Sequence, residues 1–302
     1  METHKKGCLS NQKTTYFDNE LEKNRNNYFF FLLSWFFRIF AKKFSIMLFE
    51  NIVFGPIKSR RLGNSLGVNL LPTHKKLCNF NCVYCECGWN EETKDIDDKL
   101  NNKEDIKRAL KERLIEMKEK NIPLDSITFS GNGEPTMHPE FSEIIDIVVE
   151  LRNQYAKDAK ISVLSNATNL IRDDVFNALH KVDNPILKLD AGTEKMFYAI
   201  NKANPKVISF EKTIERLIAF GKDAIVQTLL LRGENDKIRI DNTTEEEFGS
   251  WLKIVKKINP RYVMLYPIDR ITPESNLEKL TKEELELFAN KIRAIGIETK
   301  AY

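Results

Sequence analysis

The chain has 302 residues, of which 42% are hydrophobic and 30% are charged, with 12 Gly and 10 Pro. This length can bury a full core in one large domain or two small ones, and the composition excludes fibrous and mostly disordered proteins. The net charge of +3 arises in residues 1–46, which carry eight basic and four acidic side chains, so the remainder is nearly neutral and favours no polyanionic partner.

Residues 1–46 differ in composition from the rest of the chain. A beginning rich in Asn and Lys is followed by a Phe-dominated stretch at 28–41. That stretch is shorter than the roughly 20 residues of a membrane-spanning helix, so we expect no stable membrane insertion; an interfacial helix is the alternative. Lys42 and Lys43 stand where a signal-peptide cleavage site would be. We expect translation to start at Met47, so that 1–46 is not part of the native protein and 47–302 is the functional domain.

Short apolar strands and amphipathic helices alternate from residue 66 onward. The predicted strands are 67–71, 126–129, 161–164, 186–189, 224–231 and 262–265. The predicted helices are 104–120, 141–152, 173–179, 210–220, 245–258 and 282–295. Six such units predict an α/β fold of parallel strands with right-handed crossovers. The pattern alone is compatible with part of a barrel or with an open doubly wound sheet.

Three cysteines lie in the short sequence CNFNCVYC, which follows the first predicted strand. Cys78, Cys82 and Cys85 form a C-x3-C-x2-C array. Thiolates suit iron–sulfur clusters, copper(I) or zinc, and three of them can hold three corners of a [4Fe-4S] cube, leaving its fourth iron open. The alternatives are a zinc site completed by Cys87 or His74, and ordinary buried or disulfide-bonded cysteines. The absence of a second cysteine pair and the odd cysteine number disfavour both.

Polar motifs follow the other predicted strands. They are SGNGEP at 130–135, SN at 165–166, KLDAG at 188–192, RGEN at 232–235 and YPIDR at 266–270. In parallel α/β folds the carboxyl ends of the strands meet at one rim, where ligands bind, so we expect these motifs to lie together with the cysteine loop. Taken singly, Asn and Asp at such positions are as typical of helix caps and turns.

The order of these motifs resembles the radical S-adenosylmethionine (SAM) superfamily, in particular its stand-alone iron–sulfur oxidoreductases similar to the wyosine-base tRNA enzymes. The resemblance covers about residues 54–274. It implies a partial (β/α)6 barrel of the TIM type with parallel strands. It also implies one [4Fe-4S] cluster on Cys78, Cys82 and Cys85, with SAM chelating the open iron. Wyosine-type enzymes hold a second cluster on further cysteines, whereas the body of this chain has only Cys87 to spare.

The resemblance also assigns the residues that would bind SAM. It places the aromatic residue before the third cysteine beside the adenine, the glycine and glutamate of GNGEP at the amino group, and the polar groups after two later strands at the carboxylate and ribose. These residues are Tyr84, Gly133, Glu134, Ser165, Asn166 and Asp190. Asn132, between the glycines, departs from the plain Gly-Gly-Glu form of the family.

The implied activity is reductive cleavage of SAM to methionine and a 5′-deoxyadenosyl radical, which abstracts hydrogen from a substrate. A low-potential donor, flavodoxin or ferredoxin, would reduce the cluster, and a thiolate cluster implies a reducing compartment, the cytoplasm. Family similarity and the basic sequence SRR at 59–61 favour RNA, such as tRNA, as the substrate. The neutral body favours a peptide, a protein or a small metabolite. A structural zinc protein or an iron–sulfur electron carrier remains the non-catalytic alternative.

Overall fold

The computed structural model describes residues 47–90 and 100–302. The expectations for residues 1–46, including the start at Met47, concern a segment outside the described residues.

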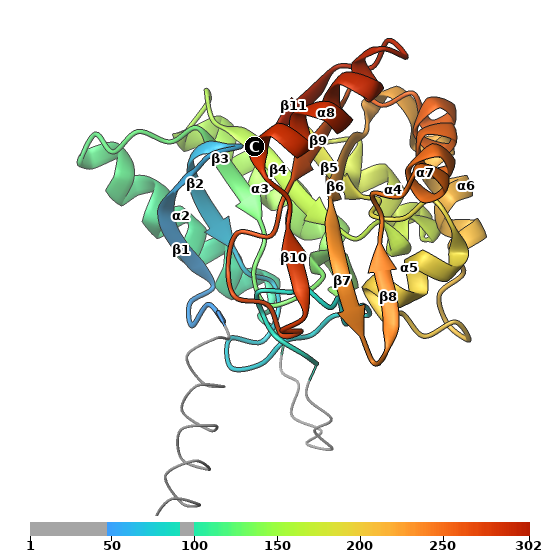
Figure 1. Ribbon diagram of the computed structural model, residues 1–302. Coiled ribbons are helices and arrows are strands. Elements are labelled where there is room, and N and C mark those ends of the chain that lie inside the picture. Colours follow the sequence, from blue (N-terminus) through green and yellow to red (C-terminus); the bar gives the residue numbers. More distant parts are fainter. Residues whose placement is uncertain (1–46, 91–99) are drawn as a thin grey trace, which may run out of the picture. The chain divides into compact units, whose positions relative to one another are not determined.

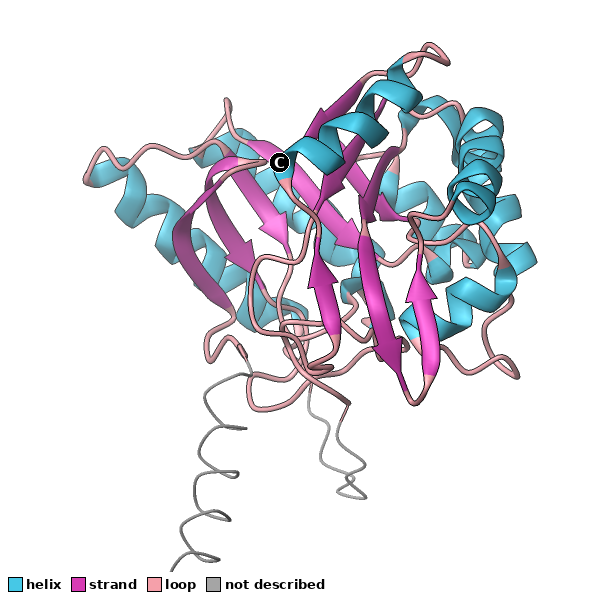
Figure 2. Cartoon of the chain, in the orientation of Figure 1, coloured by secondary structure: helices cyan, strands magenta, loops and turns pink. Residues whose placement is uncertain are grey.

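A mostly parallel sheet forms the centre of the described chain (Figures 1 and 2). Its strands, in spatial order, are β1 (Val53–Ser59), β2 (Gly63–Val68), β3 (Ser126–Phe129), β4 (Lys160–Ser165), β5 (Asn184–Lys188), β6 (Ile225–Leu229), β9 (Tyr262–Tyr266) and β11 (Thr299–Ala301). Strand β1 is antiparallel to β2, and every later neighbour pair is parallel.

The strand order decides between the two architectures that the sequence pattern allowed. From β2 to β9 each new parallel strand adds beside the previous one, without the reversal that defines a doubly wound sheet. Right-handed crossovers that always advance in one direction place their helices on one face, as in a TIM barrel. The predicted partial barrel is therefore confirmed, with β1 and β11 as additional edge strands.

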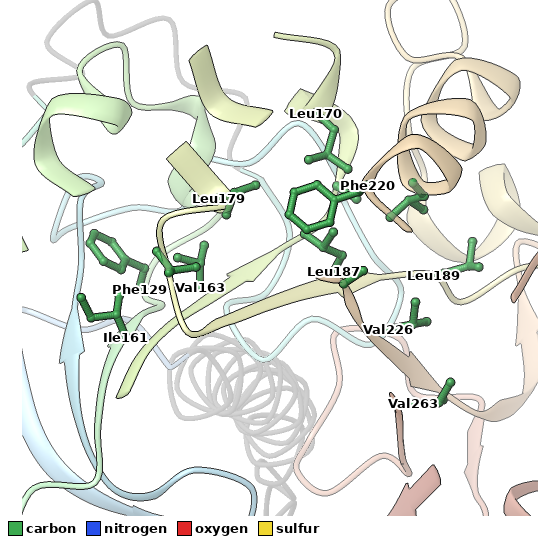
Figure 3. Packing of buried hydrophobic residues seen from close by; sticks show 14 of the residues in the cluster. Phe129, Ile161, Val163, Leu170, Leu179, Leu187, Leu189, Phe220, Val226 and Val263 are labelled. Carbon is green, nitrogen blue, oxygen red and sulfur yellow. The ribbon is translucent and has the colours of Figure 1, made fainter. Parts of the chain in front are cut away.

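The helices pack on the sheet through an apolar core. They are α2 (Lys103–Glu119), α3 (Phe141–Tyr155), α4 (Asp173–Leu179), α5 (Glu194–Asn201), α6 (Phe210–Phe220), α7 (Glu245–Ile258) and α8 (Lys282–Arg293), with 3-10 turns η1 (Pro135–Met137), η2 (Thr168–Ile171) and η3 (Gly221–Asp223). Figure 3 shows Val163 and Leu187 of the strands beside Leu179 and Phe220 of the helices, all of them buried in one cluster. This core holds the strand ends in fixed positions.

Helix α7 shows why its sequence forms a helix with these ends. The Thr244 side chain accepts a hydrogen bond from the backbone N–H of Glu247, and the first turn carries three glutamates. Lys256 and Lys257 lie in the last turn, so charges at both ends oppose the helix dipole. Asn259 then adopts a left-handed conformation and stops the helix.

A second, three-stranded antiparallel sheet was not predicted. It consists of β10 (Leu277–Lys279), β7 (Leu231–Asn235) and β8 (Ile238–Asp241), in that order. The predicted strand 224–231 is in fact interrupted at Leu230, whose N–H donates to the carbonyl of Tyr266, and the chain then enters β7. The predicted motif at 232–235 thus lies in this second sheet rather than at the end of a barrel strand.

Among the described residues, no helix is both long and apolar enough to cross a membrane.

Candidate active site

The cysteine loop follows the carboxyl end of β2 (Figure 1). Backbone hydrogen bonds join the start of this loop to the sequence GNGEP after β3. The N–H of Leu77 donates to the carbonyl of Asn132 over 2.8 Å, and the N–H of Glu134 donates to the carbonyl of Leu77 over 3.1 Å. A Cβ atom on Gly133 would lie 1.8 Å from that Leu77 carbonyl oxygen. A glycine is therefore required here so that the two backbones can approach each other.

The sulfur of Cys78 lies at the end of a chain of polar side chains from β4 and GNGEP. The amide of Asn166 lies 3.9 Å from Cys78 Sγ and donates to Asn79 Oδ1 over 2.6 Å. Glu134 accepts hydrogen bonds from the Ser165 hydroxyl at 2.8 Å and from the Asn166 backbone N–H at 2.6 Å. Glu134, Ser165 and Asn166, predicted separately from three positions in the sequence, therefore form one group beside the first cysteine.

The Glu134 carboxylate is 2% exposed. Burial raises its pKa, although the Thr136, Asn166 and Ser165 donors oppose that shift. The buried group is thus held by hydrogen bonds within the protein, as buried carboxylates require.

The sulfur of Cys82 faces a buried cation. Lys188 Nζ donates to Cys82 Sγ over 2.9 Å and lies 3.2 Å from Asp190 Oδ2. The Tyr84 hydroxyl donates to the same Asp190 carboxylate, and the Leu229 N–H donates to Asp190 Oδ1 over 2.9 Å. Burial would lower the pKa of Lys188, but Cys82 and Asp190 raise it, so the lysine remains charged. The predicted pair Tyr84 and Asp190 is joined here through one carboxylate.

The sulfur of Cys85 has a third environment. A hydrogen bond from Cys87 and the charge of Lys76 lower the pKa of Cys85 to about 5, despite burial. The same hydrogen bond and burial raise the pKa of Cys87, whose Sγ also donates to the Gly131 carbonyl over 3.4 Å. Cys87 therefore lies within hydrogen-bond reach of Cys85.

The three sulfurs of the cysteine loop therefore have three different polar environments. All four cysteines of the described residues are free thiols. Within residues 47–90 and 100–302, no three His, Cys, Asp or Glu side chains converge as one metal ion would require. In a [4Fe-4S] cluster each thiolate binds a different iron. Hydrogen-bond donors at the sulfurs, as at Cys82 from Lys188, are the interactions that stabilise thiolate clusters.

Some participating residues could not be found from sequence. The charge of Lys76 lowers the pKa of Cys85. The Asn201 side chain, 119 positions after Cys82, accepts a hydrogen bond from Cys82 Sγ over 3.6 Å. Nothing in the pattern marks Asn201, because it lies at the end of α5, a helix that was not predicted. Lys188 belongs to the predicted rim motif KLDAG, but the sequence does not show that its side chain is only 9% exposed and is directed to Cys82.

The two arginines of the basic sequence at 59–61 contact other segments of the chain. Arg60 forms an ion pair with Asp269 at 2.8 Å. Arg61 donates to Gln227 over 3.1 Å and lies 4.8 Å from the ring centroid of Tyr266. Both guanidinium groups therefore connect the β1–β2 hairpin to β6 and to the segment after β9.

Comparison with known proteins gives a consistent result. Residues 73–244 match the model of the radical SAM superfamily. The chain is 35% identical over 243 residues to the UPF0026 protein of Helicobacter pylori strain J99, covering 78% of this chain and 71% of that protein. It is 33% identical over 238 residues to a protein named GTPase Obg from Brachyspira hyodysenteriae, but spans only 32% of that protein's length.

Solved structures show the same fold. A radical SAM methyltransferase from Sphaerobacter thermophilus superimposes with a TM-score of 0.60 at 15% identity, covering 79% of this chain and 65% of that chain. The structure of TYW1 with a lysine-pyruvate adduct bound gives a TM-score of 0.51 at 16% identity, covering 76% and 73%. At these identities the similarity establishes the architecture, and function must be argued from the site.

Proposed function

Because the chain belongs to the radical SAM superfamily, we propose that it binds a [4Fe-4S] cluster on Cys78, Cys82 and Cys85 and cleaves SAM reductively. The observation that carries this proposal is the separate polar environment of each of the three sulfurs, in a loop fastened to GNGEP. When bound, the cluster and SAM supply one-electron cleavage of a C–S bond and a 5′-deoxyadenosyl radical.

The residues of this chain would hold and orient that pair. Lys188 keeps a positive charge beside Cys82, which compensates the negative charge of a thiolate-ligated cluster. We propose that Gly133, Glu134, Ser165 and Asn166 contact the methionine part of SAM, and that Tyr84 and Asp190 contact the nucleoside. Glu134 and Asp190 already accept several hydrogen bonds, so each would act through oxygen lone pairs that remain, or exchange one partner for SAM.

The substrate that we favour is a peptide, a protein or a small metabolite. The basic residues that favoured RNA from sequence are engaged, Arg60 with Asp269 and Arg61 with Gln227. A salt-sensitive complex with tRNA in gently purified protein would contradict this choice, because phosphate contacts weaken steeply with salt. We expect a low-potential flavodoxin or ferredoxin as electron donor and the cytoplasm as the location.

Anaerobic reconstitution tests the cofactor. We expect about four iron and four sulfide per chain, as one [4Fe-4S] cluster requires. Stoichiometric zinc without iron under the same conditions would contradict the proposal and favour the structural zinc alternative.

A further inference from the structure

A surface cavity of about 390 Å³ lies beside the cysteine loop. Three short segments form it: Asn79 of the loop, the η2 turn with the residue after it, and the stretch from Pro205 to Thr213 that leads into α6. Its lining residues are Asn79, Thr168, Asn169, Ile171, Arg172, Pro205, Lys206, Val207, Ile208, Ser209, Lys212 and Thr213. We call this surface the η2–α6 cavity.

The η2–α6 cavity is adjacent to the predicted cluster but separate from the residues proposed for SAM. Asn79 follows Cys78 directly, and its amide donates to Thr168 Oγ1 over 2.7 Å, so the loop itself forms part of the wall. None of the six residues assigned to SAM lines the cavity. A molecule seated there would touch the residue beside a cluster ligand without occupying the SAM site.

The η2–α6 cavity combines exposed apolar side chains with positive charge. Val207 is 76% exposed and Ile171 is 55% exposed. The lining contains Arg172, Lys206 and Lys212 and no acidic residue. Arg172 is paired with Asp174 at 2.5 Å, whereas among the described residues the two lysine side chains have no ion pair. A lining that combines exposed apolar side chains with positive charge, here called the cationic rim where Lys206 and Lys212 lie, is suited to a weak, charge-steered encounter with an acidic protein.

We propose that the η2–α6 cavity is the docking surface of the electron donor, a small acidic redox protein that presents its prosthetic group at an apolar patch within an acidic face. This inference rests on the proposed function, because it assumes a cluster on the cysteine loop. One electron passes from the donor, which is oxidised by one electron, to the cluster, which is reduced by one. No atom or proton is transferred. Transient redox complexes of this kind have small interfaces.

The test measures the rate of cluster reduction in the reconstituted full chain by an acidic flavodoxin reduced beforehand. Lys206→Glu combined with Lys212→Glu reverses the charge of the rim. The matched control is Lys118→Glu combined with Lys157→Glu, which reverses two exposed lysines of another cavity. That cavity also includes Ile122 and Leu124, which precede β3, so it lies at the opposite ends of the strands.

We expect the rim variant to be reduced at least about tenfold more slowly than wild type at low ionic strength, because steering by opposite charges acts on the association rate. The control variant should match wild type, and high salt should slow wild type towards the rim variant. Equal rates for rim variant and wild type, or equal slowing of the control, would overturn the proposal. Reduction with dithionite, which needs no docking, reports separately whether a cluster is present; its failure in wild type would overturn the proposed function itself.

Discussion

Lys188 Nζ lies 2.9 Å from the sulfur of Cys82, and 3.2 Å from Asp190 Oδ2, in a site where the lysine side chain is 9% exposed and the aspartate side chain is fully buried. A buried cation is stable only when partners compensate its lost hydration. Lys188, the last residue of β5, therefore contacts Cys82 of the cysteine loop. Its partner Asp190 also accepts a hydrogen bond from Tyr84 of the same loop. Burial raises the pKa of the Cys82 thiol, and the positive charge of Lys188 opposes that shift.

Replacing Lys188 should lower the stability of the fold. Lys188→Met leaves the Asp190 carboxylate buried without its cation, which we expect to lower the free energy of unfolding by about 3 kcal/mol. Adding Asp190→Asn should recover part of the loss, because the unpaired charge is then removed. Urea unfolding followed by circular dichroism measures both. Lys181→Met, which breaks the exposed pair with Asp146, is the control and should have a much smaller effect.

Gly133 should not tolerate a side chain. Gly133→Ala places a Cβ within 1.8 Å of the Leu77 carbonyl oxygen at a φ of +138°, so we expect a loss of more than about 2 kcal/mol in stability. Gly249→Ala is the matched control, because nothing lies within 4 Å of that Cβ in α7 and alanine favours helix by roughly 0.5–1 kcal/mol. Similar stabilities for the two variants would show that Leu77 and Gly133 are not in close contact.

Asp183 should make the stability depend on pH in the acid range. Burial would raise its pKa, but the Ile161 N–H at 2.8 Å and Arg152 at 3.0 Å hold the pKa below its ordinary value. Because the folded pKa is depressed, this contribution is present above the unfolded value of about 3.9 and is lost as the pH falls through the folded pKa. The difference in unfolding free energy between wild type and Asp183→Asn should therefore be about 1–2 kcal/mol at neutral pH and shrink below pH 4. A difference that does not change with pH would contradict this assignment.

Cys87 should be dispensable for the cluster where its three neighbours are not. Cys78→Ala, Cys82→Ala and Cys85→Ala each remove one ligand and should abolish iron–sulfur absorbance near about 400 nm after reconstitution. Cys87→Ala removes hydrogen bonds to Cys85 and to the Gly131 carbonyl but no proposed ligand, so the absorbance should remain largely intact. Loss of the cluster in Cys87→Ala alone would show that the ligands were assigned wrongly.

Most of the fold could be predicted because the buried strands and the amphipathic helices carry strong periodic signals. Helices α4, α6 and α7 begin and end where the sequence predicted. Strand β2 runs from Gly63 to Val68, four residues before the predicted start, because Gly63 and Asn64 lack the apolar character of a strand. Helix α5 and the small sheet were missed because they are short and show no clear hydrophobic periodicity. Their apolar side chains pack against the cysteine loop and its surroundings.

The candidate site was predictable where residues lie within a recognisable motif and unpredictable where contact depends on the tertiary fold. The sequence indicated that the motifs after β3 and β4 share a rim, and the structure joins Glu134 to Ser165 and Asn166. It could not indicate that Lys188 is directed to Cys82, because alternation along β5 does not show what lies opposite a side chain. It could not indicate the contacts of Arg60 and Arg61 either, because their partners Asp269 and Gln227 are more than 160 positions away.

The most direct test of the central claim is the product analysis of SAM incubated with the reconstituted, dithionite-reduced chain. Mass spectrometry should detect 5′-deoxyadenosine and methionine in equal amounts with wild type and with Cys87→Ala, and neither product above background with Cys82→Ala. A wild-type chain that carries a full [4Fe-4S] cluster, accepts an electron and leaves SAM uncleaved would contradict the account.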